Sequence, residues 1–327
     1  MTDEKIAGWD QYWAHGFLTS CADAFRGNYE GAMRGAWETA FSALPEGSRI
    51  LDVATGNGAI ALIAAATARD QGKKFSIDAF DLARIDPHKA TARQHRELLD
   101  DIRFHPRVDA AALPFADAEF DFVCGHFALE YTAVERAVAE LDRVCDKQAA
   151  GLFVMHHANS VILQTTAEEK RHLALLDETA LFEHAGAFID LVGSTAPKMR
   201  AHLQTLPHAE QLRTALNTAA ARVTEAVGTA THPEILRTAL TVVADAYNQV
   251  GTRGLDAATT RLASGSEQIR ANASRLADLV AAARSRKQMA ELESLFVANH
   301  FAATTVDTLE DDNGLLIGWT LEINRND

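Results

Sequence analysis

Apolar runs and polar turns alternate with regular spacing over residues 49–157 of the chain. Five apolar runs of strand length are separated by turns or by stretches whose apolar residues have helical spacing. The runs are 50–53, 75–80, 102–108, 120–124 and 151–156, and the helical stretches are 59–69, 89–100 and 133–144. Strands that alternate with helices in this way predict a doubly wound, mostly parallel α/β sheet.

From residue 160 to residue 285 the strand pattern is absent, and the chain is rich in Ala, Leu, Thr, Glu and Arg. Apolar residues recur there at helical spacing, which predicts an all-helical block. One stripe repeats every seven positions: Leu255, Leu262, Ile269 and Leu276. A stripe of this kind serves packing within the chain or a homodimer seam, and the sequence leaves both open while favouring the first.

The sheet pattern returns near the C-terminal end. A helix is expected at 287–299, followed by strands at 303–309 and 316–324 that a turn at 311–314 joins as a hairpin. The predicted sheet then has seven strands, and the helical block is an insertion into it. The predicted parts are an N-terminal helical cap (1–45), a Rossmann-like sheet domain (46–159 and 286–327) and a helical insertion (160–285).

The cap is rich in aromatic residues, namely Trp9, Tyr12, Trp13, Phe17, Phe25, Tyr29 and Trp37. Aromatic side chains bury large apolar areas, so they fill cores as readily as they form walls of ligand sites. The cap therefore covers the edge of the sheet, helps to close a ligand site, or does both.

Composition narrows the classes of function. The formal net charge of −14 and the absence of a Lys/Arg run disfavour nucleic acid as a partner. No apolar run approaches the length of about 18 residues that a membrane span needs, and the acidic start lacks the pattern of a secretory signal. The three cysteines, Cys21, Cys124 and Cys145, are too few for a disulfide framework. We therefore expect a cytoplasmic protein with no membrane partner.

Small residues follow the first predicted strand, in the order Asp52, Val53, Ala54, Thr55, Gly56, Asn57 and Gly58. Small residues between a strand and a helix let the backbone approach a ligand closely, as in nucleoside cofactor sites. The same glycines, with Ala61 and the acidic Asp81, also satisfy the dinucleotide pattern. On its own this turn therefore leaves a nicotinamide-dependent oxidoreductase open.

Further motifs follow in order: Ala79-Phe80-Asp81-Leu82, then residues 108–115 (VDAAALPF) and 119–123 (EFDFV). Together with the acidic residue and two glycines of the first turn, they resemble the class I S-adenosylmethionine-dependent methyltransferase family. The resemblance covers roughly residues 45 to 157 and leaves the cap and the insertion without support. It implies S-adenosylmethionine as the cofactor and S-adenosylhomocysteine as its product.

The resemblance also implies roles for residues. The loop from Asp52 faces the methionine part and the ribose, Asp81 takes the ribose hydroxyls, and Asp109 with Ala110 meets the adenine. Carboxylates suit these positions because they accept hydrogen bonds from the ribose diol and the adenine amino group; as ordinary capping residues they would have no such role. The predicted cofactor residues are Asp52, Ala54, Thr55, Gly56, Asn57, Gly58, Asp81, Leu82, Asp109, Ala110, His126 and Phe127.

The segment after the fourth strand should lie near the methyl acceptor, because ligands of such folds collect at the carboxyl ends of the strands. The predicted substrate-binding residues are Tyr12, Trp13, Phe17 and Tyr131. Three histidines that follow strands are candidates for a catalytic base, since imidazole titrates near neutral pH: His126, His156 and His157. We favour His157, because side chains alternate along a strand and only one of the paired histidines should face the cleft.

Each histidine has the alternative of a hydrogen bond within its own loop or of support for the cofactor pocket, and a carboxylate acceptor would need no base. A metal ion is not expected, because no carboxylate or cysteine completes a ligand set. We predict a methyltransferase for a small molecule, in the first place an O-methyltransferase for an aromatic or carboxylic metabolite. The insertion would be a lid, part of the acceptor pocket or a dimer contact. The remaining alternatives are the oxidoreductase and a non-catalytic scaffold that binds the cofactor.

Overall fold

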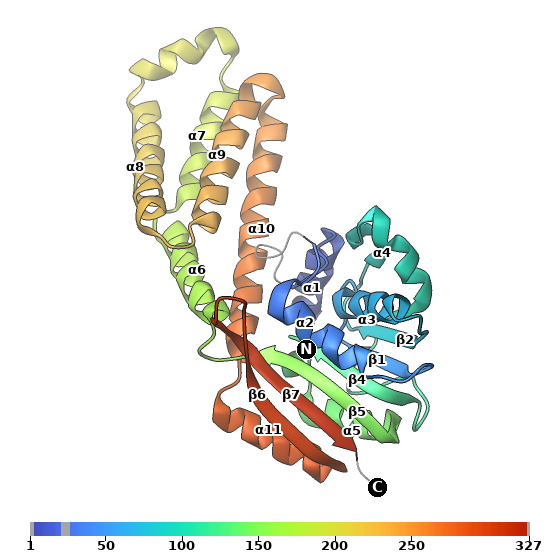
Figure 1. The fold of residues 1–327 in the computed structure, drawn as a ribbon. Helices are drawn as coiled ribbons and strands as arrows, with labels where there is room; N and C mark the ends of the chain where they lie inside the picture. Colours follow the sequence, from blue (N-terminus) through green and yellow to red (C-terminus); the bar gives the residue numbers. More distant parts are fainter. Residues whose placement is uncertain (1–2, 21–26, 326–327) are drawn as a thin grey trace. The chain divides into compact units, whose positions relative to one another are not determined.

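The structure is a computed structural model that describes residues 3–20 and 27–325 of the chain (Figure 1). Two of the residues discussed above, Cys21 and Phe25, lie outside this range. The chain divides into two compact units. The sheet unit comprises Met1–Leu163 and Asp278–Asp327, and the helical unit comprises Gln164–Ala277.

The sheet unit contains a seven-stranded sheet with the order β3-β2-β1-β4-β5-β7-β6. β7 pairs antiparallel with both β5 and β6, whereas the other pairs are parallel. The strands are β1 (Arg49–Val53), β2 (Ser76–Asp81), β3 (Ile102–Pro106), β4 (Phe120–His126), β5 (Cys145–His156), β6 (Phe301–Glu310) and β7 (Leu316–Arg325). The predicted fold class, a mostly parallel Rossmann-like sheet of seven strands, is confirmed.

Helices cover both faces of this sheet, as the continuous apolar sequences of its central strands require. One buried cluster joins α2 and α3 to the sheet, and a second joins α5 and α11 to it. The helical segments of the unit are α1 (Asp3–Ala14), α2 (Gly31–Ser42), α3 (Ala59–Asp70), α4 (Pro87–Ala90), η1 (Arg93–Asp101), η2 (Leu129–Tyr131), α5 (Val134–Val144) and α11 (Arg286–Ala298).

The helix predicted at 89–100 is different in the structure. A single α-helical turn, α4, begins at Pro87 with the Asp86 side chain accepting from Lys89 N. Thr91 then has extended backbone angles, and the following segment η1 is a 3₁₀ helix. Of its nine residues only Leu98 and Leu99 are buried, so the segment has too little apolar surface to stabilise a full α-helix against the sheet.

The strand order reverses at β1, because the chain adds β2 and β3 on one side of it and β4 and β5 on the other. In open α/β sheets the connections leave a crevice at such a reversal, outside the carboxyl ends of the strands. The described fold therefore places a ligand site at the ends of β1 and β4.

The helical unit has its own buried core. Its elements are α7 (Leu181–Ser194), η3 (Pro197–Thr205, a 3₁₀ helix), α8 (Pro207–Thr229), α9 (Glu234–Thr252) and parts of α6 (Val161–Glu178) and α10 (Leu255–Ala282). The seven-residue stripe belongs to this core: Leu262, Ile269 and Leu276 are buried, and Leu255 packs against them half-buried. The stripe therefore serves packing within the chain.

None of the helices in the described ranges is long and apolar enough to cross a membrane.

Candidate active site

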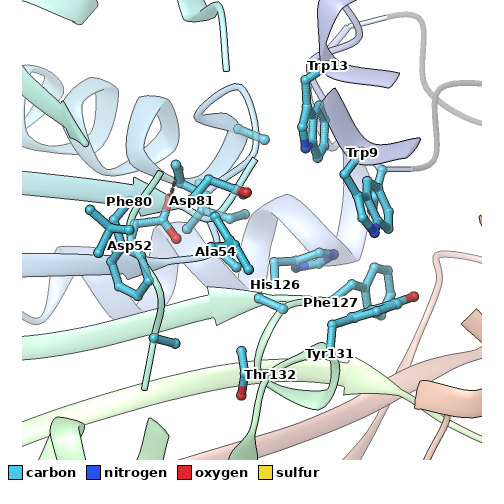
Figure 2. Close-up of a pocket in the computed structure, with 18 of the residues that line it drawn as sticks. Trp9, Trp13, Asp52, Ala54, Phe80, Asp81, His126, Phe127, Tyr131 and Thr132 are labelled. Carbon is cyan, nitrogen blue, oxygen red and sulfur yellow. Dashed lines mark hydrogen bonds between the residues drawn. The ribbon is translucent and has the colours of Figure 1, made fainter. Parts of the chain in front are cut away.

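A cavity opens in the sheet unit at the edge where β1, β2 and β4 end (Figure 2). It spans about 960 Å³ of space, part of which is open to solvent. Acidic side chains after β1, β2 and β3 line one side. Aromatic side chains from α1 and from the segment after β4 line the other side, as Figure 2 shows for Trp9, Trp13 and Tyr131.

The loop after β1 has an unusual backbone. Ala54, Gly56 and Gly58 have φ angles of 49°, 56° and 91°, in the left-handed region that favours glycine. A Cβ atom on Gly56 would lie 2.5 Å from the ring of Trp13, so glycine is required there by space as well as by conformation. Gly56 and Gly58 do not themselves line the cavity, whereas Ala54 and Thr55 do.

Asn57 attaches the N-terminal segment to this loop. Its Nδ2 donates to Trp13 O at 3.1 Å and to Phe17 O at 2.7 Å, and its Oδ1 accepts from Asp86 N at 2.7 Å. The side chain is fully buried and is not part of the cavity lining. Asn57 was predicted to contact the cofactor; the structure shows it holding α1 over the glycine loop.

Asp52 lies at the end of β1 and is almost fully buried. Its Oδ2 accepts from Thr55 Oγ1 at 2.5 Å and from Ala61 N, in the first turn of α3, at 3.2 Å. Burial raises the pKa of this carboxyl to about 7, and the hydrogen bonds offset only part of that effect. The side chain lines the cavity.

Asp81 ends β2 next to Asp52 and also lines the cavity. Its Oδ2 accepts from Gly56 N at 2.8 Å and its Oδ1 accepts from Ala83 N at 2.7 Å, which fixes the carboxylate in place. Burial raises its pKa to about 6. Each oxygen keeps a further lone pair, so the group can accept from a diol in the cavity.

The predicted adenine contacts also line the cavity. Asp109 is exposed and accepts from Ala111 N at 2.9 Å, and Ala110 is buried beside it. Leu82, predicted as a cofactor residue next to Asp81, also lines the cavity. The three predicted groups after β1, β2 and β3 are thus brought to one cavity.

The aromatic side of the cavity comes largely from α1. Trp9 and Trp13 stack with ring centroids 5.7 Å apart, and Trp9 meets Tyr131 edge-on at 5.9 Å. Of the predicted substrate-binding residues, Trp13 and Tyr131 line the cavity, while Tyr12 and Phe17 do not. Tyr12 instead packs against Trp13 at 4.9 Å and donates its hydroxyl to Thr19 O.

Of the three candidate histidines, only His126 lines the cavity. Its ring lies against Tyr29 at 4.2 Å and Phe127 at 4.4 Å, and its Nδ1 accepts from Trp37 Nε1 at 2.9 Å. Burial lowers its pKa to about 3, with a smaller contribution from His156. His126 is therefore neutral at physiological pH.

His156 and His157 lie outside the cavity lining. The His156 ring is stacked on Phe127 at 3.8 Å, and burial lowers its pKa to about 3. His157 Nδ1 accepts from Asn159 N at 2.9 Å, and its ring packs on Trp319. A hydrogen bond within its own loop was the alternative to the role of catalytic base for His157, and the structure contains such a bond.

Several residues that line the cavity were not among the predicted site residues, and the larger of their side chains include Trp9, Tyr29, Phe80 and Arg136. The i, i+4 spacing of Trp9 and Trp13 on one helical face was the signal that could have added Trp9. Arg136 has no such signal, because its place at the cavity depends on where α5 packs. Trp37, the partner of His126, lies 89 residues earlier in the chain.

Groups of three or more His, Cys, Asp or Glu side chains that could hold a metal ion are not found among the described residues.

A Rossmann-like sheet brings its glycine loop, two buried acids and an aromatic wall to one cavity, at the point where the strand order reverses. Residues 50–148 match the family model of the methyltransferase domain. The protein is an S-adenosylmethionine-dependent methyltransferase. This decides between the two interpretations of the glycine turn in favour of S-adenosylmethionine over a dinucleotide.

Solved structures with a related fold include two methyltransferases. One is the 1,6-didemethyltoxoflavin-N1-methyltransferase of Burkholderia thailandensis, solved with 1,6-didemethyltoxoflavin and S-adenosylhomocysteine. It is 12% identical, with a TM-score of 0.46, and the match covers 99% of this chain and 90% of that one. The other, from Methanococcus maripaludis, is assigned as an S-adenosyl-L-methionine-dependent methyltransferase; it is 11% identical, with a TM-score of 0.42 and coverages of 90% and 84%. The comparison with curated proteins gave no match.

Proposed function

We propose that the protein methylates a small aromatic or carboxylic metabolite on oxygen. The observation that carries the proposal is the make-up of the cavity lining: the carboxylates of Asp52 and Asp81 lie on one side, the rings of Trp9, Trp13 and Tyr131 lie on the other, and Arg136 also lines the cavity. A cofactor with a hydroxylated ribose suits the first side, and an apolar, negatively charged acceptor suits the second.

Asp81 would accept hydrogen bonds from the ribose hydroxyls, and Asp109 with Ala110 would meet the adenine. The buried Asp52 and the backbone of Ala54 and Thr55 would face the methionine part. When bound, S-adenosylmethionine supplies an electrophilic methyl group on a positively charged sulfur. Two carboxylates with raised pKa values fit this cation, because a nearby positive charge favours their ionised form.

The acceptor would lie among Trp9, Trp13 and Tyr131, whose rings bury an aromatic compound and exclude water. Arg136 is the one cation among the described residues of the lining, and it makes none of the ion pairs found between described residues. A guanidinium at the edge of an apolar cavity would bind a carboxylate with two parallel hydrogen bonds. The residues thus favour an aromatic acid as acceptor.

Methyl transfer is an in-line displacement, so the enzyme mainly aligns the acceptor oxygen with the methyl carbon and the sulfur. Because His157 lies outside the cavity lining, the proposal does not give it the role of base. A carboxylate acceptor is already ionised at neutral pH and needs none. Tyr12 and Phe17 would act indirectly, because Tyr12 packs against Trp13 and Phe17 packs against Tyr12.

The test is an acceptor screen with purified full-length protein and S-adenosylmethionine, in which S-adenosylhomocysteine and the methylated product are measured by mass spectrometry. The panel contains aromatic acids, neutral phenols, nitrogen heterocycles and a denatured protein mixture. We expect turnover with aromatic acids and an Arg136→Gln variant with a raised KM for them. The exposed Arg93→Gln variant is the control. Turnover confined to nitrogen heterocycles or to protein would contradict the proposal.

A further inference from the structure

A hydrogen bond from Trp37 sets the proton position on His126. The indole Nε1–H can only donate, and it lies 2.9 Å from His126 Nδ1. Nδ1 must therefore be the unprotonated nitrogen. In the neutral ring the single N–H then belongs to Nε2, so the tautomer of His126 follows from its partner.

The other nitrogen of His126 lacks a partner. Nε2 is buried and makes no hydrogen bond among the described residues. The ring contacts Tyr29 and Phe127, and the side chain lines the cavity while remaining only 8% exposed. Buried donors are almost always satisfied, so the partner of this N–H should be a ligand in the cavity.

The surroundings oppose protonation of the ring. Burial is the main cause that lowers the pKa of His126, Phe127 and Tyr29 offer no charge to offset it, and His156 on the neighbouring strand β5 lowers the pKa further. The Trp37 N–H would also face an N–H if Nδ1 were protonated. If this imidazole took up a proton, it would therefore lose the hydrogen bond from Trp37 that orients it.

We propose that Trp37 is a positioning residue that holds His126 as a neutral Nε2–H donor, and that His126 binds a hydrogen-bond-accepting atom of the ligand instead of removing a proton. His126 ends β4, two residues after Cys124, which pairs with Asp52 of β1, so its donor lies level with the loop that begins at Ala54. The accepting atom is a carboxylate or carbonyl oxygen or a ring nitrogen, supplied by the methyl acceptor or by the amino-acid end of the cofactor.

This inference rests on the proposed function and restricts its substrate. Because His126 is held as a donor, it does not take a proton from the acceptor, and an acceptor that is already ionised suits this arrangement. For a carboxylate, the new bond joins oxygen to the methyl carbon while the carbon–sulfur bond breaks and sulfur keeps the electron pair. The negative charge of the acceptor and the positive charge of the sulfonium cancel, so no proton is transferred. A neutral phenol would need a group other than His126 to take up its proton.

The first test measures the tautomer on the full chain labelled with ¹⁵N-histidine. We expect His126 to show a protonated Nε2 and an unprotonated Nδ1 over the range of about pH 5 to 8 in which histidines usually titrate. Trp37→Phe should release this preference and give a mixture of tautomers, while the matched variant Trp319→Phe should leave it unchanged. An Nδ1–H tautomer or an imidazolium at neutral pH would overturn the proposal.

The second test locates the accepting atom. The Nε2–H resonance of His126 is followed while S-adenosylhomocysteine is added, and then while sodium benzoate is added to that complex. A shift at the first step assigns the donor to the cofactor, and a shift at the second assigns it to the acceptor; both support the proposal. A resonance that moves at neither step overturns it.

Two variants separate donation from packing. His126→Gln keeps an N–H near the position of Nε2, whereas His126→Phe keeps the ring and lacks the donor. We measure the affinity for whichever compound, S-adenosylhomocysteine or benzoate, shifts the Nε2–H resonance. We expect this affinity to fall about tenfold or more in the Phe variant and to recover in the Gln variant. Because these measurements need only binding, a failed acceptor screen would refute the proposed function without deciding the role of His126.

Discussion

Asp81 illustrates how one side chain acquires its properties from its neighbours. Two backbone N–H groups, of Gly56 and Ala83, hold its carboxylate from one side, and burial at the cavity raises its pKa to about 6. The exposed Asp109, which follows the neighbouring strand β3, shares the cavity without being buried. The same residue type thus meets the cavity in a buried and in an exposed environment.

Replacing Asp81 by Asn should weaken S-adenosylhomocysteine binding about 10- to 100-fold, because an amide offers one accepting oxygen and lacks the charge that strengthens bonds to hydroxyls. Isothermal titration calorimetry of the variant and of the native protein measures the effect. Asp100→Asn, a change at an exposed position on η1, is the control and should leave the affinity as it is. An unchanged affinity in Asp81→Asn would reject the ribose role.

Binding should also depend on pH through Asp81. Its folded-state pKa is raised to about 6, so the ionised form that accepts from the ribose is present above that pH and is lost as the pH falls through it. We expect the affinity for S-adenosylhomocysteine to fall by up to about tenfold per pH unit below the pKa. The dependence should disappear in the Asp81→Asn variant, and a pH dependence that persisted there would assign it to another group, Asp52 first.

At the scale of elements, the glycine loop and α1 form one assembly. Asn57 binds the backbone at the end of α1, Gly56 leaves room for the Trp13 ring, and Asp10 accepts from Arg84 N beyond β2. The aromatic wall of the cavity is therefore held by the same loop that approaches the cofactor. A change in that loop should disturb both sides of the site.

Gly56→Ala tests this coupling. The new methyl group would lie 2.5 Å from the Trp13 ring at a backbone φ of 56°. We therefore expect the free energy of unfolding to fall by roughly 2–4 kcal/mol. Binding of S-adenosylhomocysteine should also be lost. Gly47→Ala is the matched control, because Gly47 has a φ of 81° with nothing within 4 Å of an added Cβ. It carries the conformational cost alone, roughly 1–2 kcal/mol. Equal losses in the two variants, measured by urea denaturation, would show that Trp13 does not crowd Gly56.

At the scale of the whole molecule, each unit buries its own core. The helical unit uses the stripe on α10 for this purpose, with Leu262, Ile269 and Leu276 between 5% and 8% exposed. These residues belong to a cluster with α7, α8 and α9 and are not left on a free face. The insertion as a lid, a part of the acceptor pocket or a dimer contact stays a prediction.

Ile269→Asp tests whether the stripe packs within the chain or forms a seam between two copies of it. If the stripe packs within the chain, the buried charge should unfold the helical unit or lower its stability by roughly 3–5 kcal/mol while the mass of the native particle stays constant. Met199→Asp, on an exposed residue of the same unit, is the control. Light scattering coupled to size exclusion measures the mass. A change from dimer to monomer with the helices intact would instead identify a dimer seam.

The sequence by itself determined the sheet and the chemical identity of its edge. Apolar runs at strand spacing and the Asp52 to Gly58 turn act through local backbone preferences, which is why the strands, the closing hairpin and the acidic residues after β1, β2 and β3 could be predicted. Only the tertiary structure decided which side chains meet in the cavity. His126 rather than His157 lines it, and Trp37 sets the tautomer from 89 residues away. Contacts of that kind depend on how helices pack on the sheet, and no local pattern records them.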